Sequence, residues 1–422
     1  MTVDPARKAA LDLLVLALGK RAGLEAALDA PALALLEPKD RNFARAAAMA
    51  TLRHLGPIDR ALDGRLQKPP PDPVRMILRL GAAQMFFLDV PDYAAVDGSV
   101  GLAAADKATQ PFKGLVNGVL RRLRREGPLS SDPADLAPPW LFARWQTAYG
   151  AENARAMAAV IAEEPATDLT PRDPADAKAL AGALEATPLP GGSLRRVGRG
   201  RIEDWPGFAE GRWWVQDAAA AIPARLMGAG SGETVIDLCA APGGKALQLA
   251  AAGAAVTALD RSASRLKRLT EGLRRTGLAA EVVAADAETW DDPRVFDAVL
   301  LDAPCSSTGT FRRNPDVLWT LTAPDVAKVA AVQSRLLDAA VRRVKPGGRL
   351  IYCVCSLETE EGESQAREFL RRHPDFATAP IAAGEGGAPA ASVTAEGWLR
   401  ILPHHLDGGL DGFFVARFAR AG

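Results

Sequence analysis

Two cysteine-containing segments carry side chains suited to covalent chemistry. Cys305 follows Asp302-Ala-Pro after one apolar run, and Cys355 ends a second run two residues after Cys353. A thiolate adds reversibly to electrophilic carbons, and a nearby acid or second thiol can exchange protons with the product of that addition. We therefore take Cys355, Cys305 and Asp302 as candidate catalytic residues.

Methylation of a cytosine carbon is a reaction that needs such a set. Carbon 5 of the ring becomes nucleophilic after a thiolate adds to carbon 6, and an acid near ring nitrogen 3 stabilises the adduct. A base then removes the proton on carbon 5 so that the thiolate can leave. The alternative is structural, because free cysteines are often small buried hydrophobes, and Cys353 is best explained in that way.

A zinc site is the other use of a Cys-x-Cys pair. The remaining Cys239 and four scattered histidines supply no second pair at the usual ligand spacing. We therefore predict no metal.

A glycine-containing turn follows the apolar run at 235–238 and leads into a predicted helix at 246–252. This turn matches neither common nucleotide-phosphate pattern, because Ala246 follows Lys245 and the first glycine is missing. Asp260 and Asp286 follow the next two predicted strands, where carboxylates could bind ribose hydroxyls and an adenine amino group. Each acid could equally be a solvated loop residue.

The elements that must position these residues fall into two classes. Apolar residues recur at helical spacing through 5–126, as at Leu11, Leu14, Val15 and Leu18. After Trp214, short β-type runs alternate with helical stretches, which predicts a doubly wound, parallel-type α/β sheet. The predicted strands are 235–238, 255–259, 281–284, 298–301, 349–353 and 413–418.

Composition indicates a soluble globular chain of two or three domains. The 422 residues are 48% hydrophobic, with 51 basic and 51 acidic side chains. Zero net charge argues against a polycationic nucleic-acid coat but permits local basic patches. All four cysteines lie in the C-terminal half, which is a poor layout for a disulfide framework and favours a reducing compartment. No signal peptide or membrane span is found, so we expect a cytoplasmic protein that is not bound to a membrane.

Three segments, 237–245, 302–313 and 352–361, resemble the motifs of the Sun/NOL/NOP2 family of RNA cytosine-5 methyltransferases, in the family's order. The resemblance implies S-adenosyl-L-methionine as cofactor, Cys355 as nucleophile and Cys305 as the group that assists product release. It implies cofactor contacts from Cys239, Ala240, Ala241, Pro242, Gly243, Gly244, Lys245, Asp260, Asp286 and Asp302.

The N-terminal part resembles the RNA-binding NusB domain found in the bacterial 16S ribosomal RNA enzymes of this family. Residues 40–45, 80–84 and 116–122 carry this likeness. Gly127-Pro128 and 130–133 form a linker signal, followed by a Pro- and Gly-rich mixed region to about Glu210. With the two resemblances, this predicts an all-α NusB-like domain at 1–128, a linker and small mixed α/β middle domain at 129–210, and a Rossmann-like class I methyltransferase domain at 211–422. The implied partner is RNA, most directly 16S ribosomal RNA.

Two groups of arginines are candidate RNA contacts. Basic side chains on a predicted helix suit phosphates, although they could also be a solvated helix face, and a second pair follows the Cys305 loop, where we expect it beside the cofactor pocket. The residues are Arg121, Arg122, Arg124 and Arg125, and then Arg312 and Arg313.

Other functions remain open from the sequence. The same chemistry could act on transfer RNA, or the chain could be a non-catalytic RNA-binding ribosome assembly factor, which the intact Cys305, Cys355 and Asp302 argue against. A small-molecule methyltransferase is disfavoured by the NusB-like part. Two positions depart from the family: Ala246 replaces a frequent Thr, and Leu169–Asp173 replaces the usual Arg-Val-Asn, which leaves the middle-domain RNA contacts undefined. No obligate protein partner is evident.

Overall fold

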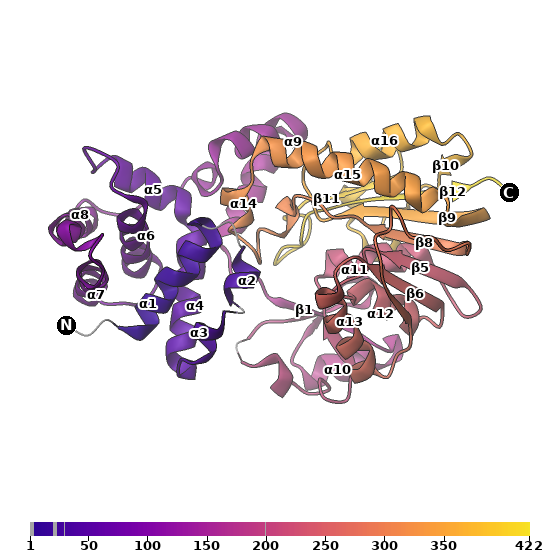
Figure 1. The fold of residues 1–422 in the computed structure, drawn as a ribbon, viewed down its shortest axis with the longest axis horizontal. Coiled ribbons are helices and arrows are strands. Elements are labelled where there is room, and N and C mark those ends of the chain that lie inside the picture. The colour runs from indigo at the N-terminus through magenta and orange to yellow at the C-terminus, as the bar shows by residue number, and fades with distance from the viewer. Residues whose placement is uncertain (1–3, 20–22, 29, 199) are drawn as a thin grey trace. The chain divides into compact units, whose positions relative to one another are not determined.

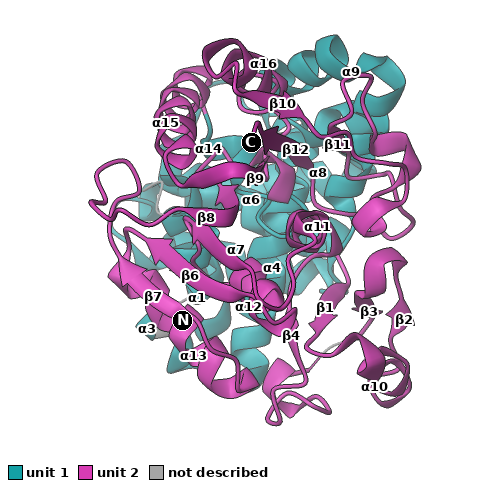
Figure 2. Ribbon diagram, turned by 90° about the vertical axis from the view of Figure 1, so that its right-hand side faces the viewer, with its two compact units in different colours: residues 1–164, 311–321 teal, residues 165–310, 322–422 magenta. Residues whose placement is uncertain are grey.

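The computed structural model describes residues 4–19, 23–28, 30–198 and 200–422 (Figure 1). The chain forms two compact units, coloured separately in Figure 2. Residues 1–164 and 311–321 make the helical unit, and residues 165–310 and 322–422 make the catalytic unit. In the part of the chain that is described, no helix has both the length and the apolar character needed to span a membrane.

The described residues before Glu164 form helices and no strands, which confirms the all-helical prediction for this part. Helix α8 shows why: Val116, Val119, Leu120 and Leu123 are buried along one face, and arginines occupy the other. The helices are α1 (Pro5–Leu14), α2 (Leu24–Leu28), α3 (Pro31–Ala34), α4 (Pro38–Arg53), α5 (Leu55–Asp63), α6 (Asp72–Phe87), α7 (Asp92–Ala105), α8 (Lys113–Arg125) and α9 (Pro139–Ala159).

A segment distant in sequence completes this unit. Residues 311–321, which include α14 (Val317–Thr320), pack with the helices, and both Phe311 and Leu318 are fully buried. Arg53 Nη2 donates to the Arg312 carbonyl oxygen at 2.6 Å, and Asp316 Oδ2 accepts from the Leu24 amide at 2.8 Å. The chain that follows Cys305 therefore leaves the catalytic unit for eleven residues.

A small antiparallel sheet opens the catalytic unit. Its strand order is β2-β3-β1-β4, and it encloses a core that includes Leu169, Leu180 and Trp213. Residues 129–210 thus divide between the units, since α9 belongs to the helical unit. The elements are β1 (Thr167–Pro171), α10 (Ala177–Ala183), β2 (Thr187–Pro188), β3 (Leu194–Arg196) and β4 (Trp213–Val215).

The second sheet has the order β10-β12-β9-β8-β5-β6-β7, with β11 paired to β12. Strands β9, β8, β5, β6 and β7 run parallel, which confirms the predicted α/β class, whereas β12 is antiparallel to β9. The strands are β5 (Thr234–Leu238), β6 (Ala255–Asp260), β7 (Glu281–Ala284), β8 (Phe296–Asp302), β9 (Val344–Val354), β10 (Phe376–Thr378), β11 (Leu399–Ile401) and β12 (Phe413–Arg420).

Helices cover both faces of this sheet (Figure 2). Alternate residues of one strand enter different cores: Val235 packs with the cluster under α11, α12 and α13, and Ile236 packs with the cluster under α15 and α16. This two-sided burial explains the continuous apolar runs in the strand sequences. The helices are α11 (Ala218–Met227), α12 (Gly244–Ala251), α13 (Ala263–Thr276), α15 (Ala323–Val341) and α16 (Glu363–Arg372).

Candidate active site

The strand order creates a crevice at the carboxyl ends of β5 and β8. From β5 the chain continues to β6 on one side of the sheet, and from the neighbouring strand β8 it continues to β9 on the other side. Open α/β sheets bind ligands at the point where the strand order reverses in this way. Cys239 follows β5, Asp302 ends β8, and Cys355 follows β9. The topology therefore brings the predicted chemical groups to one edge of the sheet.

A pocket of about 300 Å³ occupies this edge. Seven of the predicted site residues line it: Cys239, Ala241, Asp260, Asp286, Asp302, Cys305 and Cys355. Further lining residues, which the sequence did not single out, include Arg261, Arg265, Glu288 and Ser307. The predicted Ala240, Pro242, Gly243, Gly244 and Lys245 do not line it.

The two predicted catalytic thiols lie in contact. Cys305 Sγ is 3.4 Å from Cys355 Sγ, and the Ser307 hydroxyl oxygen lies 3.9 Å and 3.8 Å from these two sulfur atoms, respectively. Ser307 has a φ of 58°, a left-handed conformation that few non-glycine residues adopt and that is often found at functional sites. Ser307 was missed because a serine in a loop carries no distinct sequence signal.

The shared hydrogen bond affects the two thiols in opposite directions. A bond donated by Cys305 lowers the pKa of Cys355 below its ordinary value, although burial opposes this effect. The same bond, together with burial, raises the pKa of Cys305 well above its ordinary value. Burial also raises the pKa of Cys239 and of Cys353. Of the four cysteines, all of which are described, Cys355 is thus the one favoured as a thiolate.

Asp302, which lines the pocket, is held in place by two buried side chains. Lys245 Nζ lies 2.7 Å from Asp302 Oδ2, and Cys353 Sγ donates to Asp302 Oδ1 at 3.4 Å. Burial alone would lower the pKa of Lys245, but Asp302 and the other negative groups around it raise that pKa overall, so Lys245 is an ammonium. Lys245 therefore fixes Asp302 instead of lining the pocket.

The β5–α12 loop shapes the other end of the pocket. Asp260 is 3% exposed, and its carboxylate accepts bonds from the Ala241 amide at 3.1 Å and the Ser262 amide at 2.8 Å. Gly243 has a φ of 118°, and a Cβ there would lie 2.5 Å from Leu269 Cδ1. This position therefore requires glycine.

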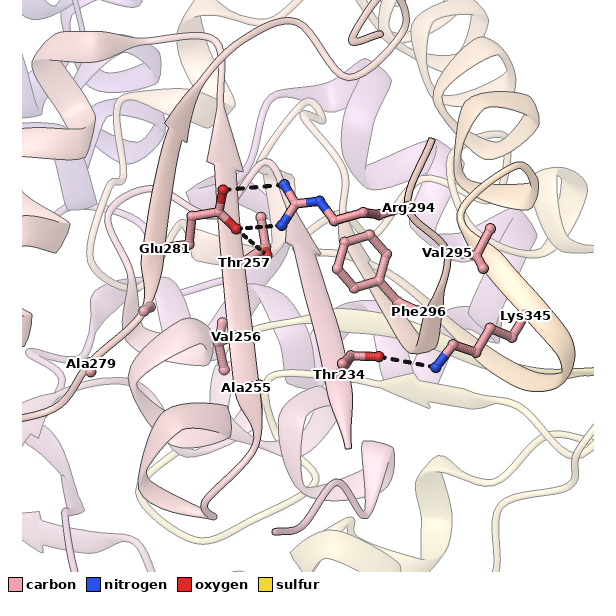
Figure 3. Close-up of a pocket in the computed structure, with 11 residues that line it drawn as sticks. Thr234, Ala255, Val256, Thr257, Ala279, Glu281, Arg294, Val295, Phe296 and Lys345 are labelled. Carbon is pink, nitrogen blue, oxygen red and sulfur yellow. Dashed lines mark hydrogen bonds and ion pairs between the residues drawn. The ribbon is translucent and has the colours of Figure 1, made fainter. Parts of the chain in front are cut away.

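A larger pocket, about 570 Å³, lies at the opposite, amino-terminal edge of the sheet (Figure 3). Its charged side chains are paired with one another or with close neighbours: Arg294 binds Glu281 at 2.6 Å, and Lys345 binds Asp297 at 2.7 Å. It contains none of the predicted site residues. The carboxyl-end pocket is therefore the candidate active site.

Comparison with known proteins supports this assignment. The family model for the 16S rRNA methyltransferase RsmB/F matches residues 224–419, and the NusB family model matches residues 4–125. Ribosomal RNA small subunit methyltransferase B of Sodalis glossinidius is 35% identical over 93% of this chain and 93% of its own. The protein of the same name from Cronobacter sakazakii is 33% identical, over 90% of this chain and 91% of its own. The chain belongs to the RsmB/F methyltransferase family.

Solved structures agree with this RsmB/F fold. The crystal structure of PH0851 has a TM-score of 0.81 at 25% identity and covers 99% of both chains. A methyltransferase homolog protein from Pyrococcus horikoshii has a TM-score of 0.57 at 26% identity and covers 66% of this chain and 94% of its own.

RsmB/F enzymes depend on S-adenosylmethionine, and the pocket of this chain fits that cofactor. The carboxylates of Asp260, Asp286, Glu288 and Asp302 line it and complement a sulfonium and an amino group. Asp260 ends β6, where a carboxylate can accept bonds from ribose hydroxyls. The predicted cofactor is therefore confirmed for this RsmB/F chain.

The two predicted groups of RNA-contact arginines differ in where the structure of this RsmB/F chain places them. Arg121, Arg122, Arg124 and Arg125 are exposed on α8. Neither Arg312 nor Arg313 lines the cofactor pocket, and both belong to the helical unit, so their expected place beside the pocket stays a prediction. Arg312 is 3% exposed, so it is not placed for a phosphate contact. Arg313, the next residue, is exposed and stays a candidate RNA contact.

Proposed function

We propose that this RsmB/F methyltransferase methylates carbon 5 of a cytidine in 16S ribosomal RNA, with Cys355 as covalent nucleophile. The observation that carries the proposal is the pair of thiols in the pocket. Cys355 has a lowered pKa, lies 3.4 Å from Cys305, and shares the pocket with Asp302. Methyl transfer to oxygen or nitrogen needs no such thiolate, whereas carbon 5 of cytosine does.

The thiolate of Cys355 adds to carbon 6, and the electron pair of the ring double bond moves toward ring nitrogen 3, which takes a proton from the hydrogen-bonded pair of Asp302 and Lys245. Ring nitrogen 3 returns this proton to the pair when carbon 5 attacks the methyl group. S-adenosylmethionine, when bound, supplies an electrophilic methyl group to carbon 5. A base then removes the proton on carbon 5, and the bond between carbon 6 and sulfur breaks. Cys305 assists this last step, because its hydrogen bond stabilises the departing thiolate of Cys355.

The names of the relatives support ribosomal RNA as the substrate. A cytosine stacked inside a helix cannot present carbon 6 to a thiol, so the target must be unpaired or flipped out. We place the RNA-binding surface of the helical unit on the exposed arginines of α8.

Reversal of charge tests this surface. Arg122 pairs with Glu126 at 2.6 Å and Arg124 with Asp92 at 2.8 Å, so Arg121 and Arg125 are the better targets. Arg121→Glu with Arg125→Glu should weaken RNA binding and reduce the salt dependence by roughly one counterion per lost phosphate contact. Arg274→Glu, exposed in the last turn of α13, is the control. An unchanged salt dependence in a filter-binding titration would exclude α8 from the interface.

The reaction is tested by transfer of labelled methyl from S-adenosylmethionine to protein-free 16S ribosomal RNA, with the product mapped by bisulfite sequencing. Cys355→Ala should abolish both transfer and the covalent adduct. Cys305→Ala should still form the adduct and remain trapped on RNA in a denaturing gel. Normal product release by Cys305→Ala would disprove the role of that thiol, and methylation of transfer RNA alone would change the substrate but not the chemistry.

A further inference from the structure

The loops that carry the two thiols share a buried carboxylate that the mechanism above does not use. Glu361 follows Cys355 by six residues, and its side chain is fully buried at 0% exposure. Among the described residues it makes no ion pair. A buried carboxylate without a cation must be stabilised by hydrogen bonds, so its donors indicate its purpose.

Those donors come from both thiol loops and from α15. Glu361 Oε2 accepts from the Ser306 amide at 2.8 Å and from Gln333 Nε2 at 2.9 Å. Glu361 Oε1 accepts from the Ser356 hydroxyl at 2.8 Å. Ser306 directly follows Cys305, and Ser356 directly follows Cys355. One carboxylate therefore joins the residues next to both thiols.

Neighbouring bonds reinforce this connection. Gln333 Nε2 also donates to the Pro304 carbonyl oxygen at 3.0 Å, on the other side of Cys305. The Ser306 and Ser356 hydroxyls lie 3.0 Å apart. The Glu361 carbonyl oxygen accepts from the Tyr352 hydroxyl at 2.6 Å, which fixes Glu361 to β9. The backbone on both sides of Cys305 thus rests on the same group that holds the Cys355 loop.

We propose that Glu361 is a positioning residue that sets the distance between Cys305 and Cys355. The inference rests on the proposed function, because the contact between the thiols matters through the thiolate of Cys355 and its departure from the base. Hydrogen bonds fall off steeply with distance and angle, so a small separation of the loops breaks the contact between the sulfur atoms. The charge of Glu361 also raises the pKa of Cys305, but its effect on Cys355 comes through this geometry.

Two substitutions separate geometry from charge. In Glu361→Gln, the amide oxygen can accept from both Ser306 and Gln333, and the amide nitrogen can donate to the Ser356 oxygen, whose hydroxyl hydrogen is free to rotate. Glu361→Ala removes all three bonds. Glu233→Ala is the matched control, because Glu233 is bonded to Arg349 in the same unit but far from the thiols in sequence and contacts.

The test is the rate at which iodoacetamide alkylates Cys355 as a function of pH, measured by peptide mass spectrometry on the full chain without RNA. We expect the midpoint of Glu361→Ala to rise by at least about half a pH unit, since the bond donated by Cys305 is lost. Glu361→Gln and Glu233→Ala should match the unsubstituted chain. With RNA, Glu361→Ala should also accumulate the covalent adduct at unchanged affinity for S-adenosylmethionine.

Coinciding profiles of Glu361→Ala and the unsubstituted chain would overturn the proposal, and so would a Glu361→Gln profile shifted as far as that of Glu361→Ala. If Glu361→Ala does not fold, Ser356→Ala gives the same readout, because it removes the bond from the Cys355 loop to Glu361 together with the hydroxyl contact to Ser306. An unshifted Ser356→Ala profile would then overturn the proposal. Alkylation needs no RNA, so a chain that failed to methylate RNA would disprove the proposed function and leave this result standing.

Discussion

Cys355 and Cys305 are alike in type, both partly exposed and 3.4 Å apart, yet their surroundings shift their pKa values in opposite directions. A thiol becomes a nucleophile to the extent that it is deprotonated, and the donor from Cys305 favours that state at Cys355. The Cys355 sulfur, as the acceptor of this bond, raises the pKa of Cys305 and so favours the protonated thiol there. The Lys245 ammonium near Cys355 and the Glu361 carboxylate near Cys305 act in the same sense, so the contact and its surroundings support the proposed division between nucleophile and assisting thiol.

Removal of Cys305 should change the pH dependence of Cys355. A lowered pKa means that the thiolate is present above that pKa and is lost as the pH falls through it. Cys305→Ala removes the main cause of the lowering, so the loss of reactivity should move to higher pH, by about 1–2 units for a hydrogen bond to a charged group.

Alkylation of the free enzyme by iodoacetamide measures this shift. Cys239→Ala is the control, because Cys239 lines the same pocket but, within the described chain, makes no hydrogen bond to either thiol. A profile for Cys305→Ala that matches the unsubstituted chain would show that the contact does not control the thiolate.

At the scale of elements, the thiols depend on close backbone contacts between the β8 loop and the final strand. The Gly309 amide donates to the Cys355 carbonyl oxygen at 3.0 Å, and the Gly412 amide donates to the Gly309 carbonyl oxygen at 2.8 Å. Gly412 immediately precedes β12, the antiparallel strand beside β9. The antiparallel end of the sheet thus supports the loop that carries Cys305.

Gly309→Ala should disturb this support. A Cβ at Gly309 would lie 2.0 Å from the Gly412 carbonyl oxygen, so the loop must move. We expect a loss of stability of about 1–3 kcal/mol in urea unfolding, with a larger loss of methyl transfer than of cofactor affinity. The control is Gly182→Ala in α10, where a Cβ meets no atom within 4 Å and helix propensity favours alanine. Full activity of Gly309→Ala would contradict this account.

At the scale of the whole molecule, the two units are not separate stretches of chain. Residues 311–321 are covalently part of the catalytic half of the sequence but pack with the helices of the other unit, where the Trp145 ring lies 5.7 Å from that of Phe311. The helical unit therefore contributes to the stability of a segment that begins six residues after Cys305.

Deletion of residues 1–164 should expose this segment. Phe311 and Leu318, both at 0% exposure, would lose their apolar surroundings, so the shortened chain should aggregate and be cut by chymotrypsin within 311–321. The full chain, treated identically, should resist cleavage there. Phe311→Ser with Leu318→Ser in the shortened chain should restore solubility. A monodisperse, protease-resistant shortened chain would contradict the prediction.

The sequence by itself determined the classes of structure and the chemical groups. Apolar periodicity predicted the helices and the main strands, because side-chain burial repeats along the chain with the geometry of each element. The motifs also predicted the thiols, Asp302 and the acids at the strand ends, and their resemblance indicated the family.

The tertiary structure alone decided how these groups act. The proposed nucleophile and the proposed assisting thiol come into contact from positions 50 residues apart. Three further features also depend on contacts between residues distant in sequence. They are the burial of Arg312, the bonds from both thiol loops to Glu361, and the packing of 311–321 with the helices. Local patterns report which face of an element is buried, whereas partners through space are set by how the elements pack, and pKa and exposure follow from those partners.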